Sequence, residues 1–526
     1  MRYWRWAVVA VLPCLFALGI FGGLAFSWRF ETSEIWGHLG TFVLREVIFN
    51  TFTLLGTVGL LAGFLGVSLA WIVTRIEFPG RSWLEWMFLL PLAFPTYVYA
   101  FLFLSLFGVS GTWIDLSEFG SWNVYCCLSL ALFPYVYLFA FNGFRQECNT
   151  QYQAARLLGA SQFRIFWKLS IQGTSSWWLG GLLIVWMECL ADFGAVSVFN
   201  YNTFTTAIYK TWFDLFSIEG AAQLSSLLCV AAVIIVLFDR LNRARKSTKG
   251  FKSPKQAIAR FHLQGFRAWA LSGGLLLFWS VSFFLPFLQL LLLTVESWFV
   301  EFSWVWIKPL GTTFGLMFVC AALALLLSIV LALYKYLVGG KLVEWVIGLS
   351  NIGYALPGSL LAIAVVLPAM YVDHFIADAQ EWFFGGVGSL WLTGTPVILL
   401  LGLAFRFFAS PLNTLDSALS SQGGSLMRAA QSLGCGPWRL LKSIIIPLHK
   451  NSIILAFLLV SLEVAKELPL TLMARPMGLT PLSVQIFEYT SEGDWERAAF
   501  PSLILLLLGI AGVALLWTHS KGTHFD

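Results

Sequence analysis

Four carboxylates stand in pairs inside two long apolar runs of the sequence. Glu188 and Asp192 interrupt WWLGGLLIVWMECLADFGAV, and Glu463 and Glu467 interrupt IILAFLLVSLEVAKELPL. On a continuous helix, a spacing of four residues places both members of a pair on one face. Carboxylate oxygens suit a hard metal cation. The chemistry that these residues offer is therefore attraction of a cation along a path, and not the making or breaking of bonds.

A charge at the centre of a bilayer costs about 2.5–3.5 kcal/mol on insertion scales, so these four groups need a reason to be there. One interpretation is that the two pairs line a passage between two halves of the chain, near its outer end. The alternative is structural: Lys466 neutralises a neighbouring carboxylate, or the pairs lie at the membrane interface. The sequence leaves both open. We assign no metal site, because tight ligation would stall passage.

The composition predicts that the chain lies in lipid. Of 526 residues, 59% are hydrophobic and 11% charged, and the mean hydropathy is +0.80. A soluble domain typically has about 25% charged residues. We predict about twelve apolar runs long enough to cross a bilayer, near residues 7–27, 52–74, 86–108, 124–142, 176–198, 220–238, 270–294, 312–336, 343–369, 390–409, 450–472 and 498–518.

The charged residues divide unevenly between alternate loops. If both termini are cytoplasmic, most of the 32 Lys and Arg residues fall in cytoplasmic loops, and most of the 27 Asp and Glu residues fall in outer loops or spans. Basic residues are expected to collect inside, and an odd number of spans would scramble this pattern. We therefore predict an all-α membrane protein with both termini in the cytoplasm. The net charge of +5 reflects this topology and predicts no nucleic-acid partner.

One pattern occurs twice in the chain. Loop 1 is YQAARLLGASQFRIFWKLSI (152–171) and loop 2 is MRAAQSLGCGPWRLLKSIIIP (427–447). The shift that aligns these loops also lays Glu188 on Glu463 and Asp192 on Glu467. A slightly smaller shift upstream lays Thr51 on Thr313 and Pro95 on Pro357. Chance similarity between apolar segments would not repeat Gly, Pro and carboxylates.

The repeat predicts two homologous six-span halves, residues 1–245 and 265–526, joined by a basic cytoplasmic linker over 246–264. Because each half holds an even number of spans, the two are expected to run parallel.

Each loop is predicted to be a cytoplasmic helix, a tight turn and a second helix. In loop 1, Gly159 suits the left-handed position that ends a helix, and Ser161 suits the N-cap of the next one. In loop 2, Gly434 ends the first helix, and Pro437 suits the first position of the second. Such a helix pair, with small residues on one face, suits a groove on a partner protein.

These loops resemble the EAA loop of ABC-importer permeases, whose pattern is Glu-Ala-Ala, three residues, Gly, nine residues and Ile-x-Leu-Pro. In that family the loop forms the coupling helix that docks on the ATPase subunit. Gln153 and Arg428 stand where the family has Glu, and Gln172 stands where loop 1 would have Pro. The coupling residues that the resemblance implies are Gln153, Ala154, Ala155, Gly159, Arg428, Ala429, Ala430, Gly434 and Pro447.

The flanking segments MECLADFGAVSVFNYNTFTTAIYKTW, LEVAKELPLTLMARP and PLAFPTYVYAF resemble the ferric-iron permeases of this superfamily. The resemblance implies a multi-pass protein of the bacterial inner membrane that imports ferric iron by alternating access. It also implies two partners, a pair of ATPase subunits, expected to be a homodimer, and an external substrate-binding protein. No Walker A pattern occurs in the chain, so we expect ATP and Mg²⁺ to be used by the partner and no cofactor to be bound here.

Three alternatives stay open at this point. Thiamine permeases share the fused two-half layout and are the nearest competitor for the substrate, and a permease for another small solute also stays open. A secondary transporter of twelve spans also uses two parallel six-span halves, but it would need no duplicated cytoplasmic helix pair. A membrane scaffold or receptor is disfavoured because the sequence shows no soluble domain to receive a signal.

Overall fold

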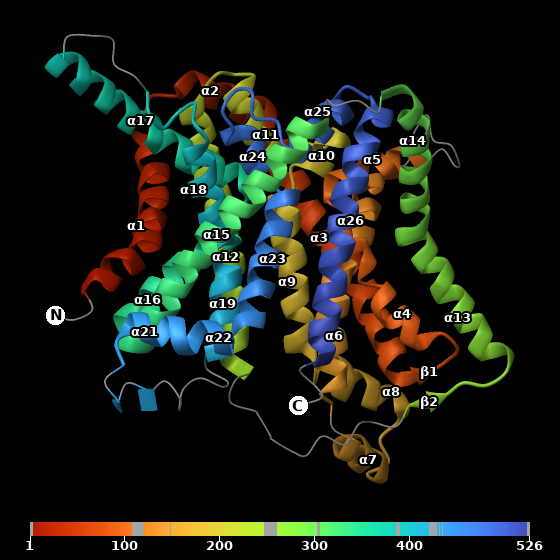
Figure 1. Ribbon diagram of the computed structural model, residues 1–526. Coiled ribbons are helices and arrows are strands. Elements are labelled where there is room, and N and C mark those ends of the chain that lie inside the picture. The colour runs from red at the N-terminus through yellow and green to blue at the C-terminus, as the bar shows by residue number, and fades with distance from the viewer. Residues whose placement is uncertain are drawn as a thin grey trace. The chain divides into compact units, whose positions relative to one another are not determined.

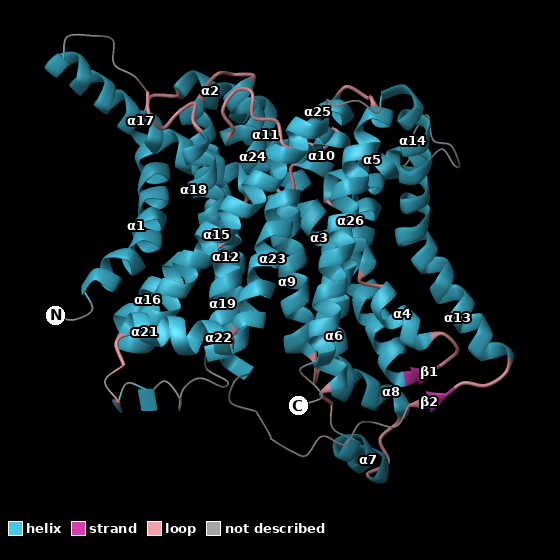
Figure 2. Ribbon diagram, in the orientation of Figure 1, coloured by secondary structure: helices cyan, strands magenta, loops and turns pink. Residues whose placement is uncertain are grey.

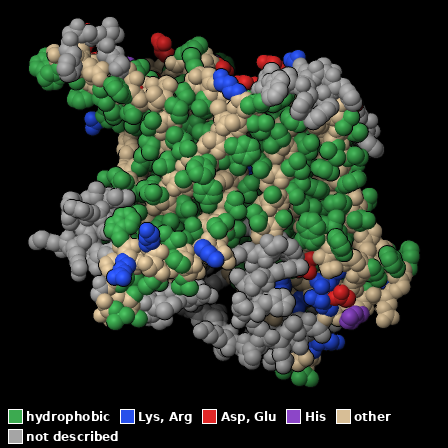
Figure 3. Space-filling model, in the orientation of Figure 1, with side chains coloured by type: hydrophobic (Ala, Val, Ile, Leu, Met, Phe, Trp, Pro, Cys, Tyr) green, Lys and Arg blue, Asp and Glu red, His purple; other side chains and the backbone are tan. Residues whose placement is uncertain are grey.

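The computed structural model describes residues 4–107, 120–147, 149–246, 260–301, 306–384, 390–419, 429–430, 432–433 and 435–522. Nearly all of these residues are helical, as predicted (Figures 1 and 2). On the face shown in Figure 3, hydrophobic side chains cover the middle of the helices, and charged side chains gather toward their ends. An apolar belt of this kind is what a surface in contact with lipid requires.

The described residues contain nine helices long and apolar enough to cross a membrane, or up to eleven if each of two bent pairs counts as one span. One further predicted span corresponds to a shorter apolar helix, Ser175–Ala191. Every predicted span therefore has an apolar helical counterpart. The count of twelve and the cytoplasmic placement of both termini stay predictions.

The chain divides into two compact units, each built from three separate stretches. Unit 1 holds Met1–Val43, Phe204–Val230 and Ser303–Glu488. Its helices are α1 (Trp4–Phe26), α2 (Ser33–His38), α11 (Phe204–Phe213), the first part of α12 (Ile218–Lys246), α15 (Ile307–Val338), α16 (Lys341–Ser350), α17 (Gly358–Phe384), α18 (Pro396–Phe407), α19 (Ala409–Ala418), α21 (Pro437–Leu440), α22 (Ile446–Leu448), α23 (Lys450–Lys466), α24 (Pro469–Ala474) and most of α25 (Leu482–Ser491).

Unit 2 holds Leu44–Thr203, Ala231–Phe302 and Tyr489–Asp526. Its helices and strands are α3 (Leu44–Arg75), β1 (Ile76–Glu77), α4 (Arg81–Met87), α5 (Thr96–Phe107), α6 (Ser121–Arg145), α7 (Asn149–Leu157), α8 (Gln162–Ile165), α9 (Ser175–Ala191), α10 (Gly194–Val198), the rest of α12, β2 (Phe261–His262), α13 (Phe266–Trp279), α14 (Leu285–Glu301) and α26 (Trp495–Gly522).

Glycines let the central helices of unit 2 approach closely. α6 packs against both α3 and α9. A Cβ at Gly66 of α3 would lie 2.6 Å from Cβ of Val136, and a Cβ at Gly181 of α9 would lie 2.8 Å from Cα of the same residue. Neither position has room for a side chain. Small residues at helix contacts are typical of membrane proteins, where close packing replaces the hydrophobic effect between helices.

The first spanning helix of each sequence half packs with helices of the other half. In unit 1, α1 buries Cys14, Ala17, Ile20 and Leu24 against α15, α16 and α17, while Leu15 and Leu18 on its other side are exposed. In unit 2, α13 packs on α4, and α14 packs on α5 and α26. Relative to the sequence halves, the compact units therefore exchange their first spans, and also α26 and the first part of α12. The boundaries at 245 and 265 stay a prediction about the repeat.

A proline breaks one span of each half. α5 begins after Pro95 at a bend of 98° from the preceding segment, and α17 begins after Pro357. Phe94 and Leu356, which precede the prolines, are extended, with ψ of 132° and 133°. The proline ring disfavours the helical conformation in the residue before it. The continuous spans predicted over 86–108 and 343–369 are wrong at these points.

The segment from Asp373 to Glu381, which separates the spans predicted over 343–369 and 390–409, is helical and not a loop. Its placement on the outer side stays a prediction. It forms the last part of α17, and Asp378 and Glu381 are exposed on it. Asp373 itself is buried, and its carboxylate accepts hydrogen bonds from the N–H groups of Trp391, Leu392 and Thr393. One side chain therefore ties α17 to the segment that leads into α18.

One small sheet departs from the all-helical prediction. β1 continues directly from α3, and β2 precedes α13, and the two pair in parallel through Ile76–Phe261 and Glu77–His262. The ladder continues with the N–H of Leu263, which donates to the carbonyl of Glu77 at 3.3 Å. The basic linker predicted over 246–264 is thus fixed at its end to the helix of the second span.

The predicted topology can be tested with single cysteines. A cysteine at Asp378 should react with a membrane-impermeant thiol reagent in intact spheroplasts. This exposed position is near the C-terminal end of α17, which lies at the end of unit 1 opposite α21 and α22 (Figure 1). A cysteine at Arg164 in loop 1 should react only after permeabilisation. Labelling would be measured above that of the unchanged chain. A protected Asp378→Cys would contradict the predicted orientation.

Candidate functional site

Loop 1 has the predicted helix, turn and helix. α7 ends at Leu157, Gly159 has a φ of +76°, and α8 begins at Gln162. The N–H of Arg164 donates to Oγ of Ser161 at 3.4 Å, which is the expected N-cap contact. A Cβ at Gly159 would meet nothing within 4 Å. Glycine is therefore favoured here by the left-handed backbone and not by lack of space.

The surface of loop 1 is apolar and unusually exposed. The side chains of Leu157, Leu158 and Phe163 are 89%, 87% and 74% exposed. Gln153 and Ala154 on α7 are also exposed, and Ala155 is half-buried. Exposed apolar side chains gathered on one short element mark an interaction surface. The loop lies at the end of unit 2 that also carries β1 and β2 (Figure 1).

The described part of loop 2 repeats this surface. Ala429 and Ala430 are helical, Pro437 is the first residue of α21, and Pro447 lies in α22. Leu433 and Trp438 are 88% and 72% exposed. Arg428 and Gly434 lie outside the described residues, so the predicted turn at Gly434 stays a prediction. Pro437 confirms the predicted start of the second helix.

The membrane carboxylates do not share a helix face in the predicted way. α9 ends at Ala191 and α23 ends at Lys466, and the next residues, Asp192 and Glu467, are extended, with ψ of 130° and 122°. The prediction that each pair lies on one face of a continuous helix is therefore wrong. Glu188 and Glu463, within α9 and α23, are half-buried. Their placement along a passage stays a prediction.

In unit 2, Asp192 caps α10 and contacts the first residue of α5. Its Oδ1 accepts a hydrogen bond from the N–H of Val196 in α10 at 3.1 Å. It also accepts hydrogen bonds from the Ala195 N–H and from the side chain of Thr96, the first residue of α5. The Asp192 side chain is buried. A buried carboxylate is tolerated where backbone N–H groups at helix N-termini surround it.

Glu467 does the same in unit 1. Oε1 accepts from the N–H of Leu470 at 3.0 Å, and Oε2 accepts from both the N–H and the hydroxyl of Thr471 at 2.9 Å. Nη1 of Arg406 lies 3.5 Å from Oε1. A Cβ at Gly358, the first residue of α17, would lie 2.5 Å from the same oxygen. Glu467 therefore sits between the N-termini of α24 and α17.

The two units thus contain the same junction. In each, the break after the fifth span of a sequence half supplies a carboxylate, and the break at a proline in the third span supplies a helix N-terminus beside it. Glu467 pairs with Arg406, which is remote from it in sequence. Neutralisation of a neighbouring carboxylate by Lys466 stays a prediction. Among the described residues, no group of three or more His, Cys, Asp and Glu side chains is placed to hold a metal ion.

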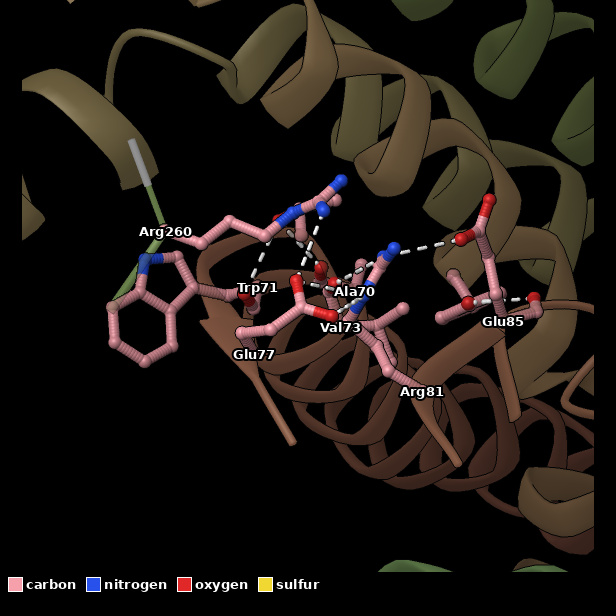
Figure 4. A network of polar contacts seen from close by, with 9 residues as sticks. Ala70, Trp71, Val73, Glu77, Arg81, Glu85 and Arg260 are labelled. Atoms are coloured by element: carbon pink, nitrogen blue, oxygen red, sulfur yellow. Dashed lines mark hydrogen bonds and ion pairs between the residues drawn. The ribbon is translucent and has the colours of Figure 1, made fainter. Parts of the chain in front are cut away.

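Sequence reasoning missed a polar network beside loop 1 (Figure 4). Arg81, at the start of α4, lies 3.3 Å from Glu77 and 3.2 Å from Glu85, and it donates to the carbonyl of Val73. Arg260, which precedes β2, lies 3.0 Å from Glu77. The network joins the linker to the end of α3. Its only sequence signal is the i, i+4 spacing of Glu77, Arg81 and Glu85, since Arg260 is remote in sequence.

Beside this network, the linker strand and loop 1 line a common cavity. A cavity of about 420 Å³ is lined by Trp71 of α3, Phe163, Ile165 and Phe166 of loop 1, and Phe261 of β2. The linker strand therefore lies against the predicted docking loop.

Two carboxyl groups in this region titrate differently. Burial raises the pKa of Glu147, and the guanidinium of Arg75 and the hydroxyl of Ser170 only partly oppose it. At Glu77, slight burial is outweighed by Arg81 and Arg260, which lower the pKa. The charge on Glu147 is therefore the more expensive of the two to maintain, and Arg75 is what supports it.

The repeated spans, the exposed loop helices and the pairing of two breaks in each unit define a membrane permease built from two copies of one module. The model of the family described as binding-protein-dependent transport system inner membrane component matches residues 62–245 and 324–518. The chain belongs to this family of ABC-importer permeases. It is a multi-pass inner-membrane protein that forms a translocation pore and is not an enzyme. The secondary-transporter alternative is therefore wrong.

Among its relatives is the Fe(3+)-transport system permease protein FbpB 2 of Haemophilus influenzae, 25% identical over 485 residues, which cover 90% of each chain. The sulfate transport system permease protein CysT of Escherichia coli is 29% identical over 190 residues, 34% of this chain and 68% of the relative. The molybdenum transport system permease protein ModB of Escherichia coli is 25% identical over 189 residues, 34% of this chain and 81% of the relative.

The junction at Glu467 predicts a stability defect. Glu467→Gln would keep one acceptor oxygen but leave Arg406 without its counter-charge, and breaking a buried ion pair typically costs about 3–5 kcal/mol. We expect less of the variant in the membrane and a lower unfolding temperature after extraction in detergent. Glu463→Gln, one turn earlier on α23 and half-buried, is the matched control. Equal losses in the two variants would contradict the capping role.

Proposed function

We propose that this permease imports ferric iron, which it receives from an external binding protein and passes to the cytoplasm by alternating access. ATP and Mg²⁺ are bound by a pair of ATPase subunits, which we take to be a homodimer. Loops 1 and 2 dock on these subunits through the exposed side chains around Gly159 and Ala430. Glu188 and Glu463 line the path of the cation.

The observation that carries the docking proposal is the exposed apolar surface repeated on both loops. Leu158 and Leu433, at matched positions just before the turns, are each nearly 90% exposed, at 87% and 88%. A leucine beyond the membrane that is left this open is costly unless a partner covers it. Arg164 and Arg439, which are also exposed, add positive charge beside these leucines. The surface therefore fits an apolar groove with an acidic rim.

The proposal of iron rests on the chemistry of the embedded groups and on the relative that spans both halves. Glu188 and Glu463 supply oxygen donors, which suit a hard trivalent cation. The helix N-termini at the breaks, which in an anion carrier would attract an oxyanion, are occupied by Asp192 and Glu467. The iron-transport relative matches 90% of this chain, whereas the sulfate and molybdenum relatives each match 34%.

Uptake by the purified complex tests the substrate. Proteoliposomes holding the chain, its ATPase and the loaded binding protein should accumulate labelled ferric iron, and not sulfate, molybdate or thiamine, when ATP is enclosed. The double variant Glu188→Gln, Glu463→Gln should lower iron uptake by about ten-fold or more, because it removes both charges that attract the cation. A ten-fold loss corresponds to roughly 1.4 kcal/mol of interaction free energy. Membrane level and ATPase association should persist. Unchanged iron uptake in this variant would place the path elsewhere.

A substitution that strains the backbone at Gly159 tests whether loop 1 docks on the ATPase. Gly159→Val should lower co-purification of the ATPase, because a β-branched residue resists a φ of +76°, while a side chain there meets nothing within 4 Å. Gly159→Asn, which tolerates the left-handed region, is the matched control and should retain the ATPase. Association would be measured by affinity capture from detergent. If Gly159→Val and the wild type capture equal amounts, the turn is not needed for docking.

A further inference from the structure

Each unit holds an ion pair at the base of its loop. In unit 2, Arg75 pairs with Glu147. In unit 1, Lys335 pairs with Asp416. Arg75 is the last residue of α3 and Lys335 lies in the last turn of α15, the helices of the second span in each sequence half. Glu147 follows α6 and Asp416 lies in the last turn of α19, the helices that lead into loops 1 and 2.

The pair in unit 2 closes loop 1 at both ends. Oε2 of Glu147 accepts a hydrogen bond from Arg75 and a second one, at 3.2 Å, from the hydroxyl of Ser170. Ser170 lies after α8, so Glu147 and Ser170 bracket α7, the turn and α8. The side chain of Arg75 is 7% exposed and that of Glu147 is 13% exposed. One carboxylate oxygen therefore joins both ends of the docking loop to the end of α3.

The pair in unit 1 is simpler and more exposed. Nζ of Lys335 lies 2.8 Å and 2.7 Å from the two carboxylate oxygens of Asp416. The side chains are 36% and 44% exposed. An exposed pair is screened by solvent and adds little to stability. The pair instead fixes the position of the end of α15 relative to the end of α19.

The two pairs are not copies at the level of sequence. The shift that lays Thr51 on Thr313 places Leu337 opposite Arg75, and the shift that aligns the loops places Gln422 opposite Glu147. One pair is Arg with Glu and the other is Lys with Asp. The same link, between the same two helix ends, is therefore made by different residues at unmatched positions.

Neither pair lies on the exposed docking surface. Leu157, Leu158 and Phe163 project from α7, the turn and α8, whereas the pairs lie where each loop joins its spans. A loop pushed by a partner can move a span only through a rigid connection. α3 already packs along α6, and α15 packs along α19, so the ion pairs complete a connection at the point where packing ends.

We propose that Arg75–Glu147 and Lys335–Asp416 are positioning residues of the transport cycle, which clamp each docking loop to its second span so that a displacement imposed by the ATPase moves that span. The proposal rests on docking of the ATPase on loops 1 and 2, and not on the identity of the substrate.

Charge exchange in the exposed pair tests the clamp. The variants are Lys335→Glu, Asp416→Lys and the double Lys335→Glu, Asp416→Lys. Asp494→Lys is the matched control, because Asp494 pairs with Arg497 at 3.3 Å and is similarly exposed. The reporter is a fluorescent probe on Gly311→Cys in α15, where a Cβ meets nothing within 4 Å. The readout is the change in probe signal when ATP and vanadate are added to the complex with the ATPase.

Each single charge reversal should lower the probe response by about five-fold or more, at the small end of usual coupling between sites. Capture of the ATPase and the membrane level should stay unchanged. The double variant should regain the response, which a merely structural defect would not allow. The Asp494→Lys response should match wild type.

A full response in either single variant would overturn the proposal, and so would a double variant that stays unresponsive. In unit 2, Glu147→Gln should likewise lower the response of a probe on α3, placed at Gly56→Cys, where a Cβ meets nothing within 4 Å. Should that buried change reduce membrane levels, the exposed pair still decides the question. A wild-type chain that captures no ATPase would instead refute the docking proposal. Absence of iron uptake with a full probe response would refute only the substrate.

Discussion

The structure depends on hydrogen-bond partners for the backbone groups at breaks in the membrane-spanning helices. A break in a membrane span leaves backbone N–H groups without partners, which costs several kcal/mol for each group in hydrocarbon. Both units meet this cost in one way: a carboxylate at one break accepts hydrogen bonds from the helix that starts there and lies against the helix that starts at a second break. Asp192 does so for α10 and α5, and Glu467 for α24 and α17. Without the backbone N–H groups, burying each carboxylate would cost free energy. Without the carboxylate, those N–H groups would lack a hydrogen-bond partner.

This junction also restricts what the embedded charges can do. Four carboxylates within apolar runs suggest a ring of equivalent ligands, but the structure divides them into two kinds. Asp192 and Glu467 are occupied by backbone donors and, for Glu467, by Arg406. Glu188 and Glu463 stay within their helices and are half-buried. If a cation passes these helices, we expect Glu188 and Glu463 to face it, whereas Asp192 and Glu467 shape the backbone at the breaks.

The loop end of each unit is organised by charge as well. Arg75 at the end of α3 pairs with Glu147 after α6. Arg81 at the start of α4 pairs with Glu77 and Glu85, and Arg260 of the linker also pairs with Glu77. Charged groups concentrate where the spans reach water, so the ion pairs there are less costly than pairs in the bilayer would be. Their effect is to make the ends of several helices, the linker strand and loop 1 one connected element. The side chains of the exposed leucines and Phe163 project from loop 1 and take no part in these ion pairs.

The sequence by itself determined the membrane class, the apolar segments, the repeat and the local form of loop 1, because these depend on composition, on spacing and on the backbone preferences of Gly159 and Ser161. The sequence also contains the cause of two breaks, Pro95 and Pro357, because the proline ring disfavours the helical conformation of the residue before it. Only the tertiary structure decided which groups meet. Arg406 is remote from Glu467 in sequence, and Arg75 and Lys335 reach Glu147 and Asp416 only because α3 packs along α6 and α15 along α19. Spacing along one helix cannot specify contacts between helices, and so the pairing of charges followed the packing.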